Sequence, residues 1–171
     1  MRLATLILLL GISAVPTRPA DAFCYEEAGN RYGISPNLLY AISKGESSFN
    51  PTAINYNTNG SYDYGLMQIN SSWEPTLRKL GIPWDTLADP CTNIMVGAWV
   101  LSQCIRDYGY TWPAVGCYNS RTPSKRDRYA ARIARIVRQG RPPQRVEQIA
   151  AIAAASNVTP WEEAFGIVAS R

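Results

Sequence analysis

The stretch over residues 35–51, SPNLLYAISKGESSFNP, constrains the fold most, because it predicts one helix with an acid on its apolar face. Ser35 is a favourable N-cap, and Pro36 suits the first helical position, where no backbone donor is needed. An apolar stripe at helical spacing follows and runs on into Glu46. An Asn-Pro pair ends the helix just past this acid. The sequence therefore predicts a buried carboxylate at the C-terminal end of a core helix.

A helix-end acid also has a plainer explanation, which is pairing with a cation such as Lys44 or Arg31. Residues and motifs that the sequence lacks exclude several kinds of catalytic site. The chain contains no histidine, which excludes serine–histidine and cysteine–histidine triads, and it has no glycine-rich phosphate loop. Without histidine or a Cys-x-x-Cys pair, a zinc site is also excluded. Carboxylates and tyrosines remain for acid–base chemistry, and we expect neither a metal nor a cofactor.

The first 22 residues have the pattern of a secretory signal peptide. Arg2 precedes an apolar run over residues 3–15, and Ala-Asp-Ala at 20–22 fits a cleavage site. The alternative is a membrane anchor, but about 13 apolar residues are too few to span a bilayer comfortably. No later run is long enough to cross a membrane. The sequence therefore predicts an exported, periplasmic chain without a transmembrane segment after cleavage.

Four cysteines fit this destination, because an even count in an exported chain predicts two disulfides. Four cysteines allow three pairings. Cys104 and Cys117 lie on consecutive predicted helices, which favours a local disulfide between them. Cys24 would then pair with Cys91, and this long closure would stabilise the fold by roughly 4 kcal/mol on the loop-entropy model.

One hairpin among several helices is the predicted architecture. Apolar and polar residues alternate on both sides of Asn59-Gly60, which predicts a β-hairpin over residues 53–69. Its tyrosines, at positions 56, 62 and 64, either line a ligand wall or only pack. Helical patterns cover residues 24–32, 36–46, 73–80, 92–108, 111–119 and 124–139. This combination predicts an α+β, mostly α, lysozyme-like fold with the hairpin beside the acid-bearing helix.

Three motifs in a fixed order resemble the soluble lytic transglycosylase (SLT) family. They are ESSFNP at 46–51, GLMQIN at 65–70 and CYNS at 117–120. The segments AINYN, NGSYD and DPC further resemble small exported members that accompany type III secretion and conjugative transfer systems. The resemblance covers residues 24–139. It implies cleavage of the β-1,4 bond between N-acetylmuramic acid and N-acetylglucosamine in peptidoglycan, near such a secretion or conjugation complex.

The resemblance also implies roles for individual residues. Glu46 matches the single catalytic acid and base. The residues matching supporting and substrate-binding positions are Ser47, Gly65, Leu66, Met67, Gln68, Tyr118, Asn119 and Tyr129. The third motif departs from the usual Ala-Tyr-Asn-Ala-Gly, because Cys117 precedes its tyrosine and Ser120-Arg121 follows its asparagine. We therefore expect the general site to be kept and the sugar subsites to differ in detail.

Burial on an apolar helix face predicts a raised pKa for Glu46, and hence a general acid at neutral pH. The resemblance implies that the same group then removes a proton from the muramoyl 6-hydroxyl, which closes a 1,6-anhydro ring without water. The alternative is a hydrolytic, lysozyme-type muramidase, which needs a second carboxylate. Asp63 on the hairpin is the candidate, although a turn-stabilising role would also explain it.

Basic residues concentrate near the C-terminal end. Residues 121–145 hold nine Lys or Arg and the single acid Asp127. This pattern fits a solvated helix face or attraction to the anionic cell wall. A non-catalytic, DNA-associated or assembly factor of a transfer system is an alternative of another class. Tyr129 is the single aromatic residue in the stretch, and no DNA-binding motif is present, which argues against DNA.

The remaining segment, residues 141–171, begins near Pro142-Pro143 and reads as a linker with short helices. Trp161, Phe165 and Val168 fall at helical spacing. This stripe predicts docking either on a secretion or conjugation complex or on the chain's own domain. The predicted organisation is thus a signal peptide at 1–22, a transglycosylase domain at 23–140 and a tail at 141–171.

Overall fold

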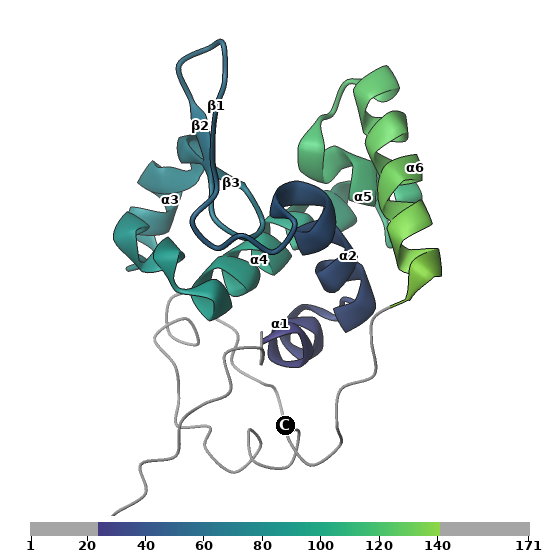
Figure 1. Ribbon diagram of the computed structural model, residues 1–171, viewed down its shortest axis with the longest axis horizontal. Helices are drawn as coiled ribbons and strands as arrows, with labels where there is room; N and C mark the ends of the chain where they lie inside the picture. The colour runs from purple at the N-terminus through teal and green to yellow at the C-terminus, as the bar shows by residue number, and fades with distance from the viewer. Residues whose placement is uncertain (1–23, 141–171) are drawn as a thin grey trace, which may run out of the picture.

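The computed structural model describes residues 24–140, so the predicted signal peptide and tail lie outside the described part. Helices dominate this part, and one small sheet interrupts them (Figure 1). The elements are, in order, α1 (Tyr25–Tyr32), α2 (Pro36–Ser47), β1 (Ile54–Tyr56), β2 (Tyr62–Tyr64), β3 (Ile69–Asn70), η1 (Ser71–Trp73), α3 (Glu74–Lys79), η2 (Trp84–Ala88), α4 (Pro90–Tyr108), α5 (Trp112–Asn119) and α6 (Pro123–Gln139). The predicted α+β, mostly helical class is confirmed.

Helix α4 runs through the centre of the molecule. Its apolar residues occur around most of its circumference, and the side chains from Thr92 to Ala98 are all buried. A helix that is apolar on all sides is stable only when other elements surround it. The side chain of Asp89 caps its start by accepting a hydrogen bond from the Thr92 N–H at 2.7 Å. In Figure 1 the sheet and α3 lie on one side of α2 and α4, and α5 and α6 lie on the other.

Helix α2 forms where its apolar stripe predicts, with Leu38, Leu39 and Ile42 in the core. Ser35 is the N-cap residue as predicted, but its hydroxyl makes no capping hydrogen bond. The backbone carbonyl of Ser35 instead accepts the N–H groups of Leu38 and Leu39. The helix ends at Ser47, and the residue after it adopts a left-handed conformation with φ of 52°. This end is the point at which Glu46 enters the site.

The hairpin is shorter than predicted and is part of a three-stranded antiparallel sheet in the order β1-β2-β3. Ile54 pairs with Tyr64 and Tyr56 with Tyr62, so that residues 57–61 form the connection. The sequence pattern extended the strands through Thr58, but that residue lies in the turn. The short strand β3 has only two residues, too few for any alternation to be visible in the sequence.

Of the two roles that the sequence left open for the hairpin tyrosines, packing is the one that the structure shows for Tyr62 and Tyr64. The register places Tyr56 and Tyr62 on one face of the sheet, and Asp63 on the other. The rings of Tyr62 and Tyr64 pack against Trp84, with centroids 5.8 Å and 6.4 Å away. Tyr62 and Tyr64 therefore pack on the outer face, where Tyr56 is largely exposed, and the face that carries Asp63 is left to polar residues.

Two disulfides join the helices. Cys24–Cys91 links the start of α1 to the first turn of α4, and Cys104–Cys117 links α4 to α5. Both pairings agree with those that the sequence favoured, and paired cysteines are typical of exported proteins. Within residues 24–140, none of the helices has the length and apolar character needed to cross a bilayer.

Candidate active site

Glu46 lies at the end of α2 with 16% of its side chain exposed, at the floor of a cleft of about 580 Å³. The two walls come from distant parts of the chain. Residues of the sheet and its turns line one wall, and residues of α5 and the start of α6 line the other. Polar side chains dominate the sheet wall, namely Asn57, Thr58, Asn59, Ser61, Asp63, Gln68 and Asn70. The opposite wall carries Tyr118, Asn119, Ser120 and Lys125. A polar cleft of this kind, lined by the carboxyls of Glu46 and Asp63, suits a hydroxyl-rich ligand.

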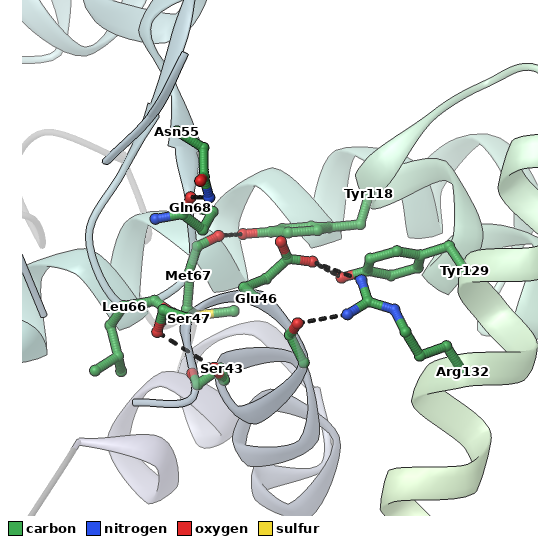
Figure 2. Close-up of polar contacts among 11 residues, drawn as sticks. Ser43, Glu46, Ser47, Asn55, Leu66, Met67, Gln68, Tyr118, Tyr129 and Arg132 are labelled. Carbon is green, nitrogen blue, oxygen red and sulfur yellow. Dashed lines mark hydrogen bonds and ion pairs between the residues drawn. The ribbon is translucent and has the colours of Figure 1, made fainter. Parts of the chain in front are cut away.

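The carboxyl of Glu46 is held from one side, by α6. The Tyr129 hydroxyl donates a short hydrogen bond to Oε1, and Nη2 of Arg132 lies 3.7 Å from the same oxygen (Figure 2). Burial of this carboxyl raises its pKa above the ordinary value of a glutamate, and the negative charge of Asp63 adds to the increase. The Tyr129 hydrogen bond and the Arg132 charge lower the pKa and only partly offset burial.

The segment from Gly65 to Gln68 forms a tight turn between β2 and β3, and Asn93 of α4 holds it from below. The Asn93 side chain accepts the Met67 N–H at 2.7 Å and donates to the carbonyl oxygens of Tyr64 and Leu87 at 3.2 Å and 3.1 Å. Gly65 has φ of +80°, and a Cβ there would lie 2.2 Å from Asn93 Nδ2. Glycine is required at this position, because no side chain fits either the conformation or the space.

Two hydroxyls tie this turn to the walls of the site. The Ser47 hydroxyl donates to the Leu66 carbonyl oxygen at 2.7 Å, and the Tyr118 hydroxyl donates to the Met67 carbonyl oxygen at 2.8 Å (Figure 2). Leu66 therefore joins the turn to α2, and Met67 joins it to α5. Burial, with the nearby charges of Glu46 and Asp63, raises the pKa of Tyr118 well above that of a free tyrosine. Tyr118 accordingly acts here as a neutral hydrogen-bond donor.

Gln68 adopts φ of +50°, a region that residues with a Cβ rarely occupy. Its Nε2 donates to the carbonyl oxygens of Gly65 and Ala53 at 2.8 Å and 3.1 Å, and its Oε1 accepts from the Asn55 side chain. These contacts compensate for the backbone strain and fix the side chain at the cleft wall. Strain that is held in place in this way is typical of functional sites.

Asp63 lines the same cleft as Glu46 but is engaged within the sheet. Its Oδ1 accepts from the Asn70 side chain at 2.7 Å, and its Oδ2 accepts from the Asn57 side chain at 3.0 Å. Both carboxyl oxygens are thus held by amide donors on either side of β2. Asp63 therefore links the hairpin turn to β3.

Comparisons with known proteins agree with this geometry. The family model of the transglycosylase SLT domain matches residues 23–134. The invasion protein IagB of Salmonella typhimurium is 43% identical over 132 residues, which cover 74% of this chain and 81% of that protein. Protein IpgF of Shigella flexneri is 43% identical over 106 residues, covering 61% of this chain and 70% of that protein. The chain belongs to the SLT transglycosylase family.

Membership of the SLT family makes the chain a peptidoglycan lytic transglycosylase. Among solved structures, an inactive mutant of lytic transglycosylase Slt from Pseudomonas aeruginosa has the same fold, with a TM-score of 0.57 and 21% identity. The alignment covers 84% of this chain and 26% of the Slt chain, so this chain spans about a quarter of the larger protein. The expected lysozyme-like architecture, with a small sheet beside the acid-bearing helix, is thereby confirmed.

The residues that the SLT resemblance singled out fall into three groups. Glu46, Gln68, Tyr118 and Asn119 line the cleft. Gly65, Leu66 and Met67 are buried behind the wall, where their backbone receives the contacts described above. Ser47 contacts the turn, and Tyr129 contacts the carboxyl. The family motif therefore combines cleft residues with residues that support them.

Two residues that shape this SLT site were missing from the sequence prediction. Arg132 was assigned to a solvated basic face, but it reaches Glu46 and the Gly45 carbonyl oxygen. Asn93 was not singled out, although a polar residue within the apolar pattern of α4 was a visible signal. For Arg132 no such signal existed, because its contact depends on how α6 crosses α2.

Proposed function

We propose that Glu46 is the single proton donor and then the proton acceptor of the reaction, and that the products carry 1,6-anhydro-N-acetylmuramic acid ends. The observation that carries this proposal is one desolvated carboxyl at the floor of a polar cleft, with a pKa above the ordinary range. A protonated carboxyl at neutral pH is what protonation of a glycosidic oxygen requires. Gln68, Tyr118 and Asn119 are the proposed substrate contacts on the two walls.

The reaction balances without water. Glu46 gives its proton to the β-1,4 glycosidic oxygen, and the bond from the muramoyl C1 to that oxygen breaks. The N-acetylglucosamine fragment leaves with the new hydroxyl. The 6-hydroxyl oxygen of the same muramoyl residue then bonds to C1, and its proton passes to the ionised Glu46. The carboxyl ends in its starting state, so one group completes the cycle.

A hydrolytic muramidase is the second candidate, because Asp63 lines the same cleft. In that reaction the second carboxylate attacks the sugar or activates a water. Both oxygens of Asp63 accept hydrogen bonds from asparagine side chains, which favours a structural role. Asp63 also contributes negative charge near Glu46, and this charge would stabilise an oxocarbenium-like centre.

Mass spectrometry of the products separates the two candidates. We expect purified peptidoglycan digested by the protein to give ends about 18 Da lighter than hydrolysed reducing ends, since no water is added. Predominantly reducing ends would contradict the transglycosylase mechanism. Glu46→Gln should abolish product release while the circular dichroism spectrum is unchanged, and substantial residual turnover would contradict the assignment of Glu46. Asp63→Asn keeps the shape of the residue and should retain most of the activity.

We also propose that the chain works in the periplasm, where it opens the wall locally for a secretion or conjugation apparatus. The relative named an invasion protein and the two disulfides support this role. Deleting residues 141–171 tests the tail as the recruiting segment. Recruitment should be lost while cleavage of isolated peptidoglycan is kept. A deletion variant that is still recruited would exclude the tail, and tight, salt-dependent duplex binding would favour the DNA-associated alternative.

A further inference from the structure

The C-terminal end of α2 is an unfavourable place for a negative charge, and Arg132 of α6 places a positive charge beside it. Glu46 sits in the last turn of the helix, where the unpaired carbonyl oxygens carry partial negative charge. Lys44 and Ser47 direct their carbonyl oxygens to the N–H groups of Ser48 and Asn50. The Gly45 carbonyl oxygen instead accepts a short hydrogen bond from Nη1 of Arg132. One guanidinium thus meets both the helix end and the carboxyl beside it.

Three contacts place this guanidinium. Its Nη1 donates to the Gly45 carbonyl oxygen, its Nη2 lies 3.7 Å from Glu46 Oε1, and its Cζ lies 4.9 Å from the centroid of the Tyr129 ring. Close contact of α2 and α6 makes this reach possible, since a Cβ at Gly45 would lie 2.8 Å from Ile133 Cδ1. The planar guanidinium of an arginine can make several such contacts at once, which the ammonium group of a lysine does less well.

Both polar contacts from α6 converge on the same carboxyl oxygen. The Tyr129 hydroxyl and the Arg132 guanidinium both approach Oε1 of Glu46. Figure 2 shows the second carboxyl oxygen turned away from these two side chains, toward Tyr118. A proton on Oε1 would face a hydrogen-bond donor and a cation, so the neutral acid carries its proton on Oε2 instead.

We propose that Arg132 is a positioning residue for Glu46, which holds Oε1 against α6 so that Oε2 is the oxygen that exchanges the proton with substrate. This inference rests on the proposed role of Glu46. Arg132 lowers the pKa of that carboxyl, against the increase from burial, and so keeps it able to ionise during the cycle. The other titratable or charged groups that act with it are Tyr129 from α6, Tyr118 from α5 and Asp63 from β2.

The test compares Arg132→Gln with Arg135→Gln, a matched loss of one positive charge from the exposed face of the same helix. Initial rates on solubilised glycan strands are measured across pH. We expect Arg132→Gln to reduce kcat by about 10- to 100-fold, since misplacing a catalytic group by an ångström has effects of that size. The alkaline limb of the profile should move to higher pH, because the acid form of Glu46 persists longer. Arg135→Gln should match the wild type in both respects.

Arg132→Lys separates charge from geometry and guards against a folding defect. Lysine keeps the positive charge but not the fork, so the alkaline limb should stay near its wild-type position while kcat is only partly recovered. If kcat falls in Arg132→Gln but the alkaline limb of the pH profile does not move, the proposal is overturned, because loss of packing alone would give that result. Wild-type kinetics in Arg132→Gln would also overturn it.

A readout independent of turnover distinguishes failure of this inference from failure of the proposed function. The carboxyl carbon of Glu46 in ¹³C-glutamate-labelled protein is followed by NMR through a pH titration, and Glu46→Gln assigns its resonance. We expect its midpoint to rise in Arg132→Gln and to be unchanged in Arg135→Gln. An unchanged midpoint in Arg132→Gln would overturn the role of Arg132 even if Glu46 proves catalytic. A shifted midpoint with full activity in Glu46→Gln would overturn the proposed function instead.

Discussion

At the scale of single residues, the site combines one carboxyl that can lose its proton with two tyrosine hydroxyls that keep theirs. Burial raises the pKa of Glu46 above the ordinary value of a glutamate, whereas burial and the adjacent carboxyl raise the pKa of Tyr118 and of Tyr129 and keep both phenols protonated. The tyrosines therefore remain donors over the working pH range. Only the glutamate changes charge, which is what a one-acid mechanism requires.

Because burial raises the pKa of Glu46, its ionisation is a cost to the folded state. The stability that this group contributes is fully present below its unfolded pKa of about 4.3, and it is lost as pH rises through the higher folded value. Glu46→Gln removes the titrating group, so the variant should be more stable than the wild type at pH 8. Gains of about 1 kcal/mol are usual when an active-site conflict is relieved.

Urea denaturation at pH 8 and pH 4 checks this expectation. The advantage of Glu46→Gln should shrink toward pH 4, where both states of the wild type bind the proton. Glu27→Gln on the exposed side of α1 is the matched control, and it should show no comparable gain at pH 8. A destabilised Glu46→Gln at pH 8 would mean that the hydrogen bond and charge from α6 outweigh burial.

The Tyr118 hydroxyl gives a second prediction at this scale. Tyr118→Phe keeps the ring, which stacks 6.4 Å from that of Tyr129, but leaves the Met67 carbonyl oxygen without its 2.8 Å partner. We expect a loss of about 1 kcal/mol in the free energy of unfolding and a reduced kcat, because the turn carrying Gln68 loosens.

Tyr110→Phe is the control for that variant. The Tyr110 hydroxyl accepts the Ser35 N–H at 2.9 Å at an exposed place outside the cleft lining. Its loss should therefore cost less stability than that of the Tyr118 hydroxyl and should leave turnover unchanged. Chemical denaturation and initial rates measure the two effects. Equal turnover in the two variants would show that the hydroxyl of Tyr118 is not needed to hold the turn.

At the scale of elements, the helices were predictable because their signals are local. Helical periodicity located α2, α4 and α6 to within two residues at each end, and Gly33 ends α1 in a left-handed conformation as a C-terminal glycine should. Strand β3 and the contact of Arg132 with Glu46 depend on tertiary pairing instead. The sequence also left the role of the hairpin tyrosines open, because alternation reveals two faces of a strand but not which face meets the cleft.

Asn93 carries the prediction that belongs to this scale, because it joins α4 to the turn between β2 and β3. Asn93→Ala would leave the Met67 N–H and two carbonyl oxygens without their partners in a buried place. We expect the free energy of unfolding to fall by about 3 kcal/mol, given the cost of each unpaired buried group, and the activity to fall with it. Asn30→Ala, on the exposed side of α1, should change stability by less than about 0.5 kcal/mol.

Urea denaturation of both variants under the same conditions measures the difference. Asn93→Asp adds a further comparison, because it keeps an acceptor for Met67 but loses the amide donor to the two carbonyl oxygens. It should be destabilised as well. If Asn93→Ala unfolded at the wild-type urea concentration, the Asn93 side chain would not be needed to hold the turn.

At the scale of the whole molecule, two disulfides join elements on which the cleft depends. Cys24–Cys91 closes a loop with a sequence separation of 67 residues, and Cys104–Cys117 closes one of 13. On the loop-entropy model the longer closure stabilises by roughly 4 kcal/mol and the shorter by about 3 kcal/mol, both mainly by restricting the unfolded chain. Because each crosslink acts on the unfolded state, its removal should lower stability more than it changes the shape of the site.

The two paired replacements, Cys24→Ser with Cys91→Ser and Cys104→Ser with Cys117→Ser, test this expectation. Both variants should unfold at lower urea, the first more than the second, and both should keep most of the wild-type kcat at a temperature where they are folded. Only the second disulfide joins α5, which carries Tyr118, to α4. A large loss of kcat in the folded second variant, without the same loss in the first, would instead show that this crosslink also positions the cleft wall.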